Sequence, residues 1–235
     1  MHNKYIPFSN DEYQRRLNLT RAAMSAKNID ILFVTDPSNM AWLTGYDGWS
    51  FYVHQGVLVF MDKDPIWWGR RQDANGALRT VWMHENHIYG YADHYVQSTE
   101  RHPMQDLARC INDHDKGQHI GIEMDNYYFS AKAYTTLLEA MPDRHFVDAT
   151  AMVNWQRGIK SDEELGFMRK AAKISEKIID GLLERVEPGV PKNDIVAEVY
   201  GDALRGVGDD WGDYPAIVPL LPSGSDAAAP HLTWD

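Results

Sequence analysis

Short apolar segments alternate with amphipathic segments along the first 150 residues, and this alternation is what most constrains the fold. Strand-like segments rich in Val, Ile and aromatic residues occupy residues 31–34, 57–61, 66–68, 87–91, 119–123 and 144–148. Helical spacing of apolar residues occupies 10–28, capped by Asn10, and 72–81, 104–112 and 130–141, with a helical turn at 40–43 closed by Gly45. Because strands that alternate with helices bury their sheet between helix layers, the pattern predicts a three-layer α/β domain that closes near residue 150.

A different pattern begins at Ser161. Ser161 and Glu164 form a Ser-x-x-Glu capping box, which predicts the start of a long amphipathic helix that Pro188 and Gly189 end. A second helix is expected over 191–205, then a loop over 206–212 and a strand near the apolar run 216–218. Two successive helices do not continue the earlier alternation. We therefore place an N-terminal α/β domain at 1–158 and the start of a second domain at 159–235.

The sequence ends at Asp235, close to the apolar run 216–218. Chain termini are usually exposed and polar. We therefore expect an N-terminal fragment that ends inside its second domain, with His231 near its end.

The formal net charge of −11 argues against a nucleic-acid partner, because binding phosphates needs a basic face. It argues equally against docking on anionic lipid. No stretch approaches 18 apolar residues, so we expect no membrane span and a cytoplasmic location. Cys110 is the only cysteine, which excludes an intrachain disulfide, and its setting on the apolar side of a helix favours packing over catalysis.

Three stretches of the sequence carry a family resemblance. Residues 157–164 read Arg-x-x-Lys-Ser-x-x-Glu, residues 34–45 follow the first expected strand, and a Pro-Ser-Gly segment leads to Pro230 and His231. Together they resemble the creatinase / aminopeptidase P / prolidase family, in which the first motif joins the two domains. The resemblance implies a creatinase-like N-terminal domain followed by the start of a "pita-bread" hydrolase domain, and a first active-site histidine at His231.

Two aromatic-rich stretches, 39–55 and 69–77, are similar to the branch of this family that hydrolyses the cyclic amidine ectoine. That resemblance implies ring opening to N-acetyl-2,4-diaminobutyrate. It also implies a homodimer in which one N-terminal domain helps to cover the partner's active site. Three alternatives remain open: a creatinase-like amidinohydrolase, a metal-dependent Xaa-Pro peptidase, and a non-catalytic pita-bread protein that binds a partner chain.

Metal dependence divides the family. Peptidase members bind two metal ions through Asp, Asp, His, Glu and Glu, whereas creatinase works without metal. The resemblance puts these ligand positions beyond Asp235, so no metal ligand is assigned here and the cofactor is unknown. Asp235 itself follows His231 too closely to match the first metal aspartate.

Four residues are candidates for binding or chemistry. His231 follows Pro230, and an imidazole there could carry a proton, although a hydrogen-bonded structural histidine is the alternative. Trp49 and Tyr52 lie on a Gly-containing aromatic segment and could form one wall of a pocket for a small cationic ring, or belong to the core. Arg70, with Arg71 beside it, is a candidate carboxylate clamp, or a solvated surface charge. The other nine histidines show no ligand spacing and are expected to be structural or exposed.

Overall fold

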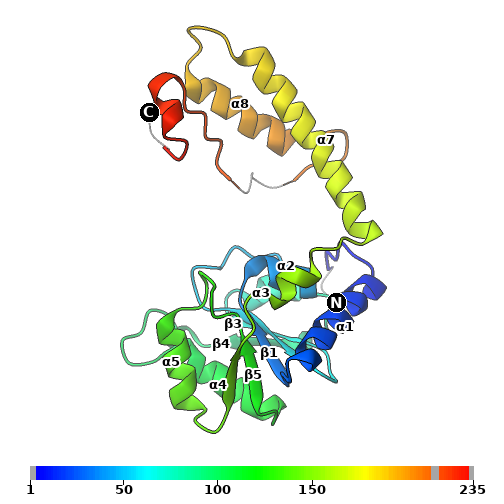
Figure 1. Cartoon of the computed structure of the whole chain (residues 1–235), viewed down its shortest axis with the longest axis vertical. Coiled ribbons are helices and arrows are strands. Elements are labelled where there is room, and N and C mark those ends of the chain that lie inside the picture. Colours follow the sequence, from blue (N-terminus) through cyan, green and yellow to red (C-terminus); the bar gives the residue numbers. More distant parts are fainter. Residues whose placement is uncertain (1–3, 213–216, 233–235) are drawn as a thin grey trace. The chain divides into compact units, whose positions relative to one another are not determined.

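The computed structural model describes residues 4–212 and 217–232. The chain divides into two compact units, Met1–Ile159 and Lys160–Asp235 (Figure 1).

One mixed sheet of six strands, in the order β4-β3-β2-β1-β5-β6, forms the centre of the first unit. The strands are β1 (Ile31–Val34), β2 (Gly56–Phe60), β3 (Ile66–Arg70), β4 (Ile88–Tyr91), β5 (His119–Ile122) and β6 (His145–Asp148). β2 runs antiparallel to both of its neighbours, β1 and β3, and the other pairs are parallel. All six strands expected from the sequence are present.

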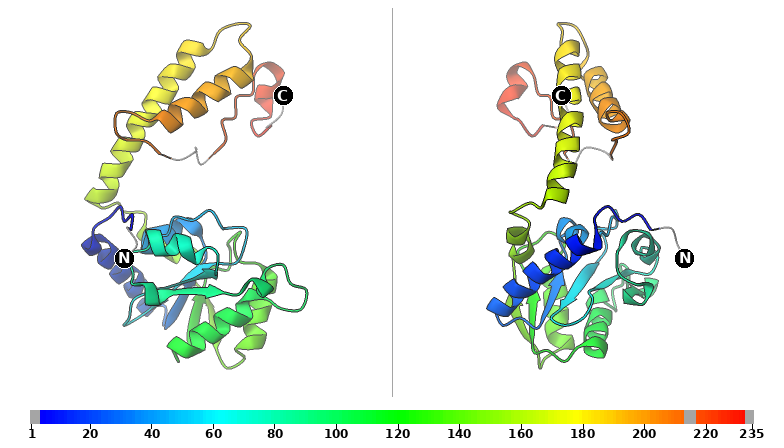
Figure 2. Two further views of the ribbon diagram at one scale, coloured as in Figure 1. Left: turned by 180° about the vertical axis from the view of Figure 1, so that it is seen from behind. Right: turned by 90° about the vertical axis from the view of Figure 1, so that its right-hand side faces the viewer.

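Helices cover both faces of this sheet, so the predicted three-layer α/β architecture is confirmed (Figures 1 and 2). α4 (Pro103–His114) and α5 (Ala131–Ala140) pack on the face to which Ile31 and Phe33 point. The opposite face, with Leu32 and Val34, is covered by α1 (Asn10–Ala26), α2 (Pro37–Thr44), α3 (Ala74–Thr80) and α6 (Met152–Gln156). The alternation of side chains along β1 thus supplies both layers of the core.

Local capping groups set where the first helices begin and end. The side chain of Ser9, and not of Asn10 as expected, caps α1 by accepting from the backbone N–H of Glu12 at 3.2 Å. Asp36 caps α2 through the N–H of Asn39, so the expected single turn is a full helix that includes the preceding proline. Gly45 ends α2 with φ +82°, a left-handed conformation that favours glycine.

Short elements were not foreseen from the sequence. α6 and the 3-10 helices Glu85–His87 and Asp93–Tyr95 are too short to show a clear apolar period. α3 begins at Ala74, two residues later than expected, because β3 continues to Arg70 and a turn follows it.

The second unit contains α7 (Asp162–Arg185), α8 (Lys192–Arg205) and a 3-10 helix (Gly224–Ala228). The predicted capping box is present: Ser161 Oγ accepts from the Glu164 N–H at 3.2 Å, and Glu164 Oε2 accepts from the Ser161 N–H at 2.7 Å. An ion pair of 2.8 Å between Arg185 and Asp202 joins α7 to α8.

The strand expected near 216–218 is only partly within the described chain. Residue 216 lies outside the described residues, as does Asp235. Residues 217–232 contain the 3-10 helix and no strand. The described part of this unit offers no neighbouring strand, and an apolar run becomes a strand only where it can pair.

Candidate functional site

The ends of the strands bring the polar and aromatic segments of the first unit to one edge of the sheet. β1, β3, β4, β5 and β6 all end at this edge, and β2 begins there, as the pairing of Val34 with Val57 and of Arg70 with Tyr91 shows. In open α/β sheets, ligands bind beyond the carboxyl ends of the strands. This edge is therefore the part of the first unit in which a site is expected.

The segment 46–55, which we call the aromatic loop, lies at this edge between α2 and β2. Its base is fixed by Tyr46, which is buried and donates from its hydroxyl to Gln55 Oε1 at 3.0 Å. Gly48 is needed there, because a Cβ at this position would lie 2.2 Å from the Tyr46 hydroxyl oxygen. The loop is thus held from below while its outer part faces solvent.

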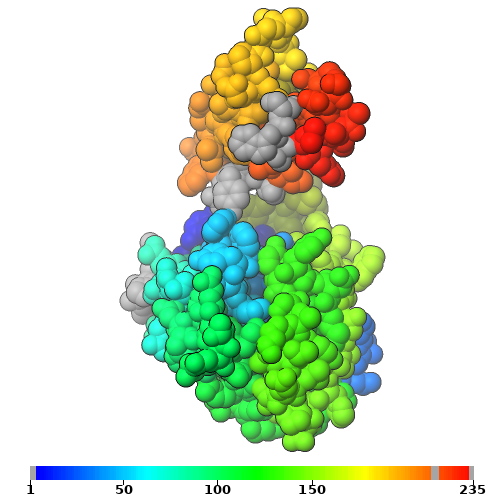
Figure 3. All heavy atoms as spheres, turned by 90° about the vertical axis from the view of Figure 1, so that its left-hand side faces the viewer, coloured from blue at the N-terminus to red at the C-terminus, as the bar shows by residue number. Residues whose placement is uncertain are grey.

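The outer part of the aromatic loop presents large rings to solvent. Trp49 is 63% exposed and Tyr52 is 61% exposed, with ring centroids 5.9 Å apart. Phe51 packs edge-on against Trp49 at 5.1 Å and against Tyr128 at 6.1 Å. Figure 3 shows the segment around residue 50, in light blue, projecting at the surface of the first unit. Such a ring cluster suits contact with a ligand or a partner.

Arg70 lies at the end of β3, and its guanidinium is already paired. Arg70 Nε donates to Asp93 Oδ1 at 2.8 Å, and this hydrogen bond is the main cause that raises the pKa of Arg70. The negative charge that Tyr52 carries when ionised adds to the same shift, so the two candidate residues are electrostatic neighbours. Arg71 is exposed. A ligand carboxylate at Arg70 would have to compete with Asp93.

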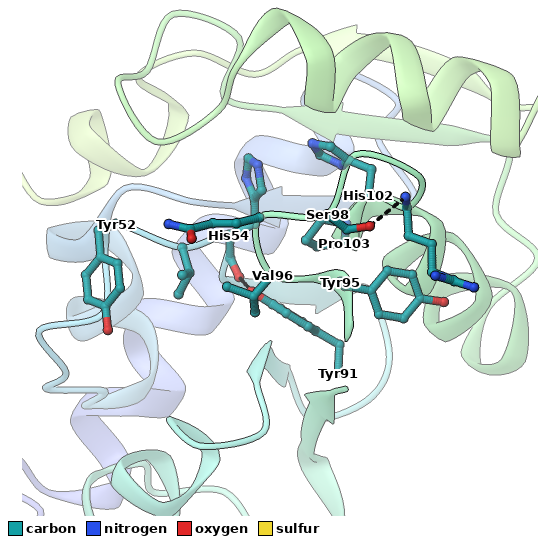
Figure 4. A pocket seen from close by; sticks show the side chains of 11 residues that line it. Tyr52, His54, Tyr91, Tyr95, Val96, Ser98, His102 and Pro103 are labelled. Carbon is teal, nitrogen blue, oxygen red and sulfur yellow. Dashed lines mark hydrogen bonds between the residues drawn. The ribbon is translucent and has the colours of Figure 1, made fainter. Parts of the chain in front are cut away.

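A cavity of about 240 Å³ opens beside the aromatic loop, and we call it the His54 cavity (Figure 4). It is lined by Tyr52, Val53, His54, Tyr91, Tyr95, Val96, Gln97, Ser98, Arg101, His102 and Pro103. The rings of His54 and His102 lie 4.8 Å apart on the same side of the cavity. Burial, and next the charge of His102, lower the pKa of His54 to about 4. No sequence signal pointed to this pair, because 47 residues separate its members and neither has ligand spacing.

A buried carboxylate, Glu123, fixes the loops that follow β1 and β5. Glu123 Oε2 accepts from the N–H groups of Thr35 at 2.7 Å and Asp36 at 2.9 Å. Asn39 donates to Glu123 Oε1 at 2.6 Å, and Asn126 donates to Oε2 at 3.2 Å. Burial raises the pKa of Glu123, and the hydrogen bonds from Asp36, Thr35 and Asn39 oppose that rise. No sequence pattern marks this residue, since a single Glu at a strand end has no characteristic spacing.

His231 belongs to the second unit, where it lies exposed in the turn that follows the 3-10 helix Gly224–Ala228. The backbone N–H of Leu232 donates to the carbonyl of Ala229 at 3.1 Å, which closes this turn around Pro230 and His231. Trp49, Tyr52 and Arg70 belong to the first unit. The structure therefore groups three of the four candidates at one sheet edge and places the fourth in the other unit.

Within residues 4–212 and 217–232, no three His, Cys, Asp or Glu side chains are arranged to hold a metal ion. In the acidic loop after α8, Asp210 forms an ion pair with Lys170 at 2.8 Å. Among the helices of the described chain, none is both long and apolar enough to cross a membrane.

Cys110 is buried on α4, as expected for a packing residue. Burial raises the pKa of its thiol to about 12, so it stays protonated and unreactive at about pH 8. We expect iodoacetamide to leave Cys110 unmodified in the folded protein and to alkylate it after unfolding in urea. Intact-mass spectrometry measures both reactions, and rapid alkylation of the folded protein would contradict the prediction.

Comparison with known proteins supports a two-part organisation. Residues 16–159 match the "Creatinase/Prolidase N-terminal domain", and residues 166–235 match "Metallopeptidase family M24". Among curated proteins, the chain is 53% identical to the ectoine hydrolase of Halomonas elongata over 98% of the chain and 59% of that protein. It is 38% identical to an uncharacterized hydrolase/peptidase of Sinorhizobium fredii over 97% of the chain and 59% of that protein. The chain thus spans 59% of the length of these two relatives.

Solved structures share the fold. The Xaa-Pro dipeptidase from Bacillus anthracis superposes with a TM-score of 0.65 at 19% identity, over 81% of this chain and 48% of that one. The prolidase from Pyrococcus horikoshii gives 0.63 at 14% identity, over 80% of this chain and 48% of that one. At this level of identity the likeness concerns the fold alone.

Proposed function

Since the chain belongs to the creatinase/prolidase family, we propose that it is part of a hydrolase that opens the cyclic amidine ring of ectoine to give N-acetyl-2,4-diaminobutyrate. The observation that supports this most is the 53% identity with an ectoine hydrolase, over 98% of the chain. Because the chain spans only 59% of that relative, the activity is proposed for the full-length protein.

The aromatic loop would supply one wall of the substrate pocket. Ectoine carries a delocalised amidinium, and a cation over an aromatic face is attracted by the ring's quadrupole. Trp49 and Tyr52 fit this role, because their rings are exposed, close to each other and anchored at the base of the loop. Arg70 would bind the ectoine carboxylate, in exchange for part of its contact with Asp93.

His231 would carry the proton that ring opening requires. Hydrolysis of an amidine adds water to its carbon and protonates the departing nitrogen, and an imidazole can both accept a proton and donate one. In this proposal, water or a carboxylate of the full-length protein attacks the amidine carbon, and this carbon lies within reach of His231.

The proposal is tested by incubating the full-length protein with ectoine, creatine and an Xaa-Pro dipeptide, and separating the products by chromatography. We expect N-acetyl-2,4-diaminobutyrate from ectoine, with the other two substrates left intact. Turnover of the dipeptide alone would favour a peptidase, in line with the M24 match, and turnover of creatine alone a creatinase-like enzyme. No turnover of any of the three would favour a partner-binding protein.

Alanine at Trp49 or Tyr52 should weaken substrate binding. A pocket wall contacts the substrate in the ground state and in the transition state alike, so we expect KM to rise about three- to tenfold with little change in kcat. Tyr5→Ala is the matched control, because Tyr5 is an exposed aromatic residue outside the aromatic loop. Steady-state kinetics with ectoine checks this, and unchanged KM in both loop variants would remove the loop from the substrate pocket.

A second copy of the protein is the expected partner. Trp49, Phe51 and Tyr127 are exposed aromatic residues at one sheet edge, and a homodimer would cover such a surface. Light scattering coupled to size-exclusion chromatography should give twice the mass of one full-length chain. A monomer at micromolar concentration would contradict the dimer.

A further inference from the structure

Two histidines that are distant in the sequence meet at the sheet edge opposite to the aromatic loop. His119 is the first residue of β5 and His145 the first of β6, and the two are directly paired in this parallel ladder. Paired residues of neighbouring strands point to the same face of a sheet. The rings accordingly lie side by side, with centroids 5.5 Å apart and an angle of 26° between their planes. Since a metal–nitrogen bond is about 2.0–2.1 Å long, rings this close can each turn one nitrogen to the same ion.

Asp30, the residue before β1, orients the His119 ring. Asp30 Oδ2 accepts from the backbone N–H of His119 at 2.9 Å and lies 3.4 Å from Nδ1 of the same residue. The backbone N–H of Asp30 in turn donates to the carbonyl of His119 at 2.9 Å, which fixes the carboxylate in place. A carboxylate beside Nδ1 favours the tautomer with the hydrogen on Nδ1, and Nε2 then keeps its lone pair for a metal ion. Histidines that bind metal ions are commonly oriented by a carboxylate in this way.

Both rings of the pair have room to adjust to an ion. His145 is exposed, and the side chain of His119 is 46% exposed, so the rings can rotate without displacing the core. The carboxylate of Asp30 also adds a negative charge beside the pair, which favours a cation there. Imidazole nitrogens suit zinc, copper and nickel ions, whereas magnesium and calcium prefer oxygen ligands.

The histidine pair of the His54 cavity provides a contrast within the same unit. The rings of His54 and His102 lie 4.8 Å apart, closer than those of His119 and His145. However, His102 Nδ1 accepts from the backbone N–H of Met104 at 3.2 Å, as the N-cap of α4. An accepting Nδ1 places the hydrogen of the neutral ring on Nε2, so neither nitrogen of His102 has a lone pair left for an ion. Ring proximity is therefore common to both pairs, but only His119 has a nitrogen kept open by its partner.

We propose that His119 and His145 form a surface site for a divalent transition-metal ion, with Asp30 as the residue that positions His119. Water completes the coordination, because the described chain offers no group of three His, Cys, Asp or Glu side chains for a metal ion. An ion bound there joins β6, the last strand of the sheet, to β5. The site shares no residue with the proposed substrate pocket, and ectoine hydrolysis does not depend on it.

Isothermal titration calorimetry on the 235-residue chain tests the site with Zn²⁺, Cu²⁺ and Mg²⁺. We expect saturable binding of Zn²⁺ and at least about tenfold tighter binding of Cu²⁺, since nitrogen ligands prefer copper to zinc. Mg²⁺ should not bind, because the site offers it no set of oxygen ligands. In NMR spectra of the histidine rings, Zn²⁺ should shift the signals of His119 and His145 together.

Three variants separate the proposed contacts from the fold. His119→Phe and His145→Phe keep a flat ring without its nitrogens, and each should weaken Zn²⁺ binding at least about tenfold. Asp30→Asn removes the charge but keeps an oxygen that can accept from the His119 N–H, and it should weaken binding about tenfold. His102→Asn is the matched control from the other histidine pair, with a residue that also caps helices, and it should leave Zn²⁺ binding unchanged. Circular dichroism checks that all four variants are folded.

Several results would overturn the proposal. These are no saturable binding of Zn²⁺ up to about 1 mM, or unchanged binding in folded His119→Phe or His145→Phe. Loss of Zn²⁺ binding in His102→Asn alone would move the ion to the His54 cavity. Equal binding of Mg²⁺ would replace the histidine site by a site of carboxylates, and unchanged binding in Asp30→Asn would reject the positioning role of Asp30.

Discussion

Alanine at position 231 of the full-length protein is expected to lower kcat for ectoine ring opening by about 10²–10⁴-fold, the usual contribution of a general acid–base group. His231 is exposed in a closed turn, so its imidazole is open to a substrate and its removal leaves no buried partner unpaired. The fold should therefore persist, and the loss should appear in kcat more than in KM. Steady-state kinetics, with circular dichroism on the same samples, measures both.

His145→Ala is the matched control for this substitution. His145 is also exposed, but it lies at the start of β6, at the sheet edge opposite to the aromatic loop. It should keep wild-type turnover. If His231→Ala did the same, His231 would lose its proposed role as proton carrier, and the ring opening would have to depend on groups outside this chain.

Alanine at Glu123 should have the largest effect on stability. The substitution leaves the buried donors of Thr35 and Asn39, and the partly buried N–H of Asp36, without their acceptor, and each unpaired donor costs free energy. We expect the free energy of unfolding to fall by about 3 kcal/mol or more. Urea unfolding followed by circular dichroism measures the change.

Glu139→Ala provides the comparison for Glu123→Ala. Glu139 is exposed on α5, and surface substitutions usually change stability by no more than about 0.5 kcal/mol. A loss of stability at Glu123 no larger than that at Glu139 would show that the network does not hold the strand ends together.

The Glu123 network bears on function through the geometry of the sheet edge. Asn39, which donates to Glu123, also accepts from Arg157 Nη1 at 2.7 Å and donates to Asn154 at 2.8 Å. These contacts join the ends of β1 and β5 to the segment that leaves the first unit. A site placed on loops needs such support to keep its side chains within reach of a ligand.

The sequence by itself determined the longer helices, the six strands of the first unit and their layers. The continuous apolar run 31–34 predicted a buried strand, which is β1, and the Ser161–Glu164 box predicted the start of α7. These features depend on contacts between residues that are close in the sequence, so their periods and spacings can be read directly. The motifs that carry the family resemblance are likewise short continuous stretches, so they too can be read directly from the sequence.

Only the tertiary structure decided which elements and side chains meet. Side-chain alternation fixes the two faces of a strand but not its neighbours, so the order β4-β3-β2-β1-β5-β6 could not be read from the sequence. The contact of His54 with His102, the pairing of Arg70 with Asp93 and the donors around Glu123 all join distant segments. Such contacts depend on how the strands are ordered and where their ends meet, and no local pattern records that.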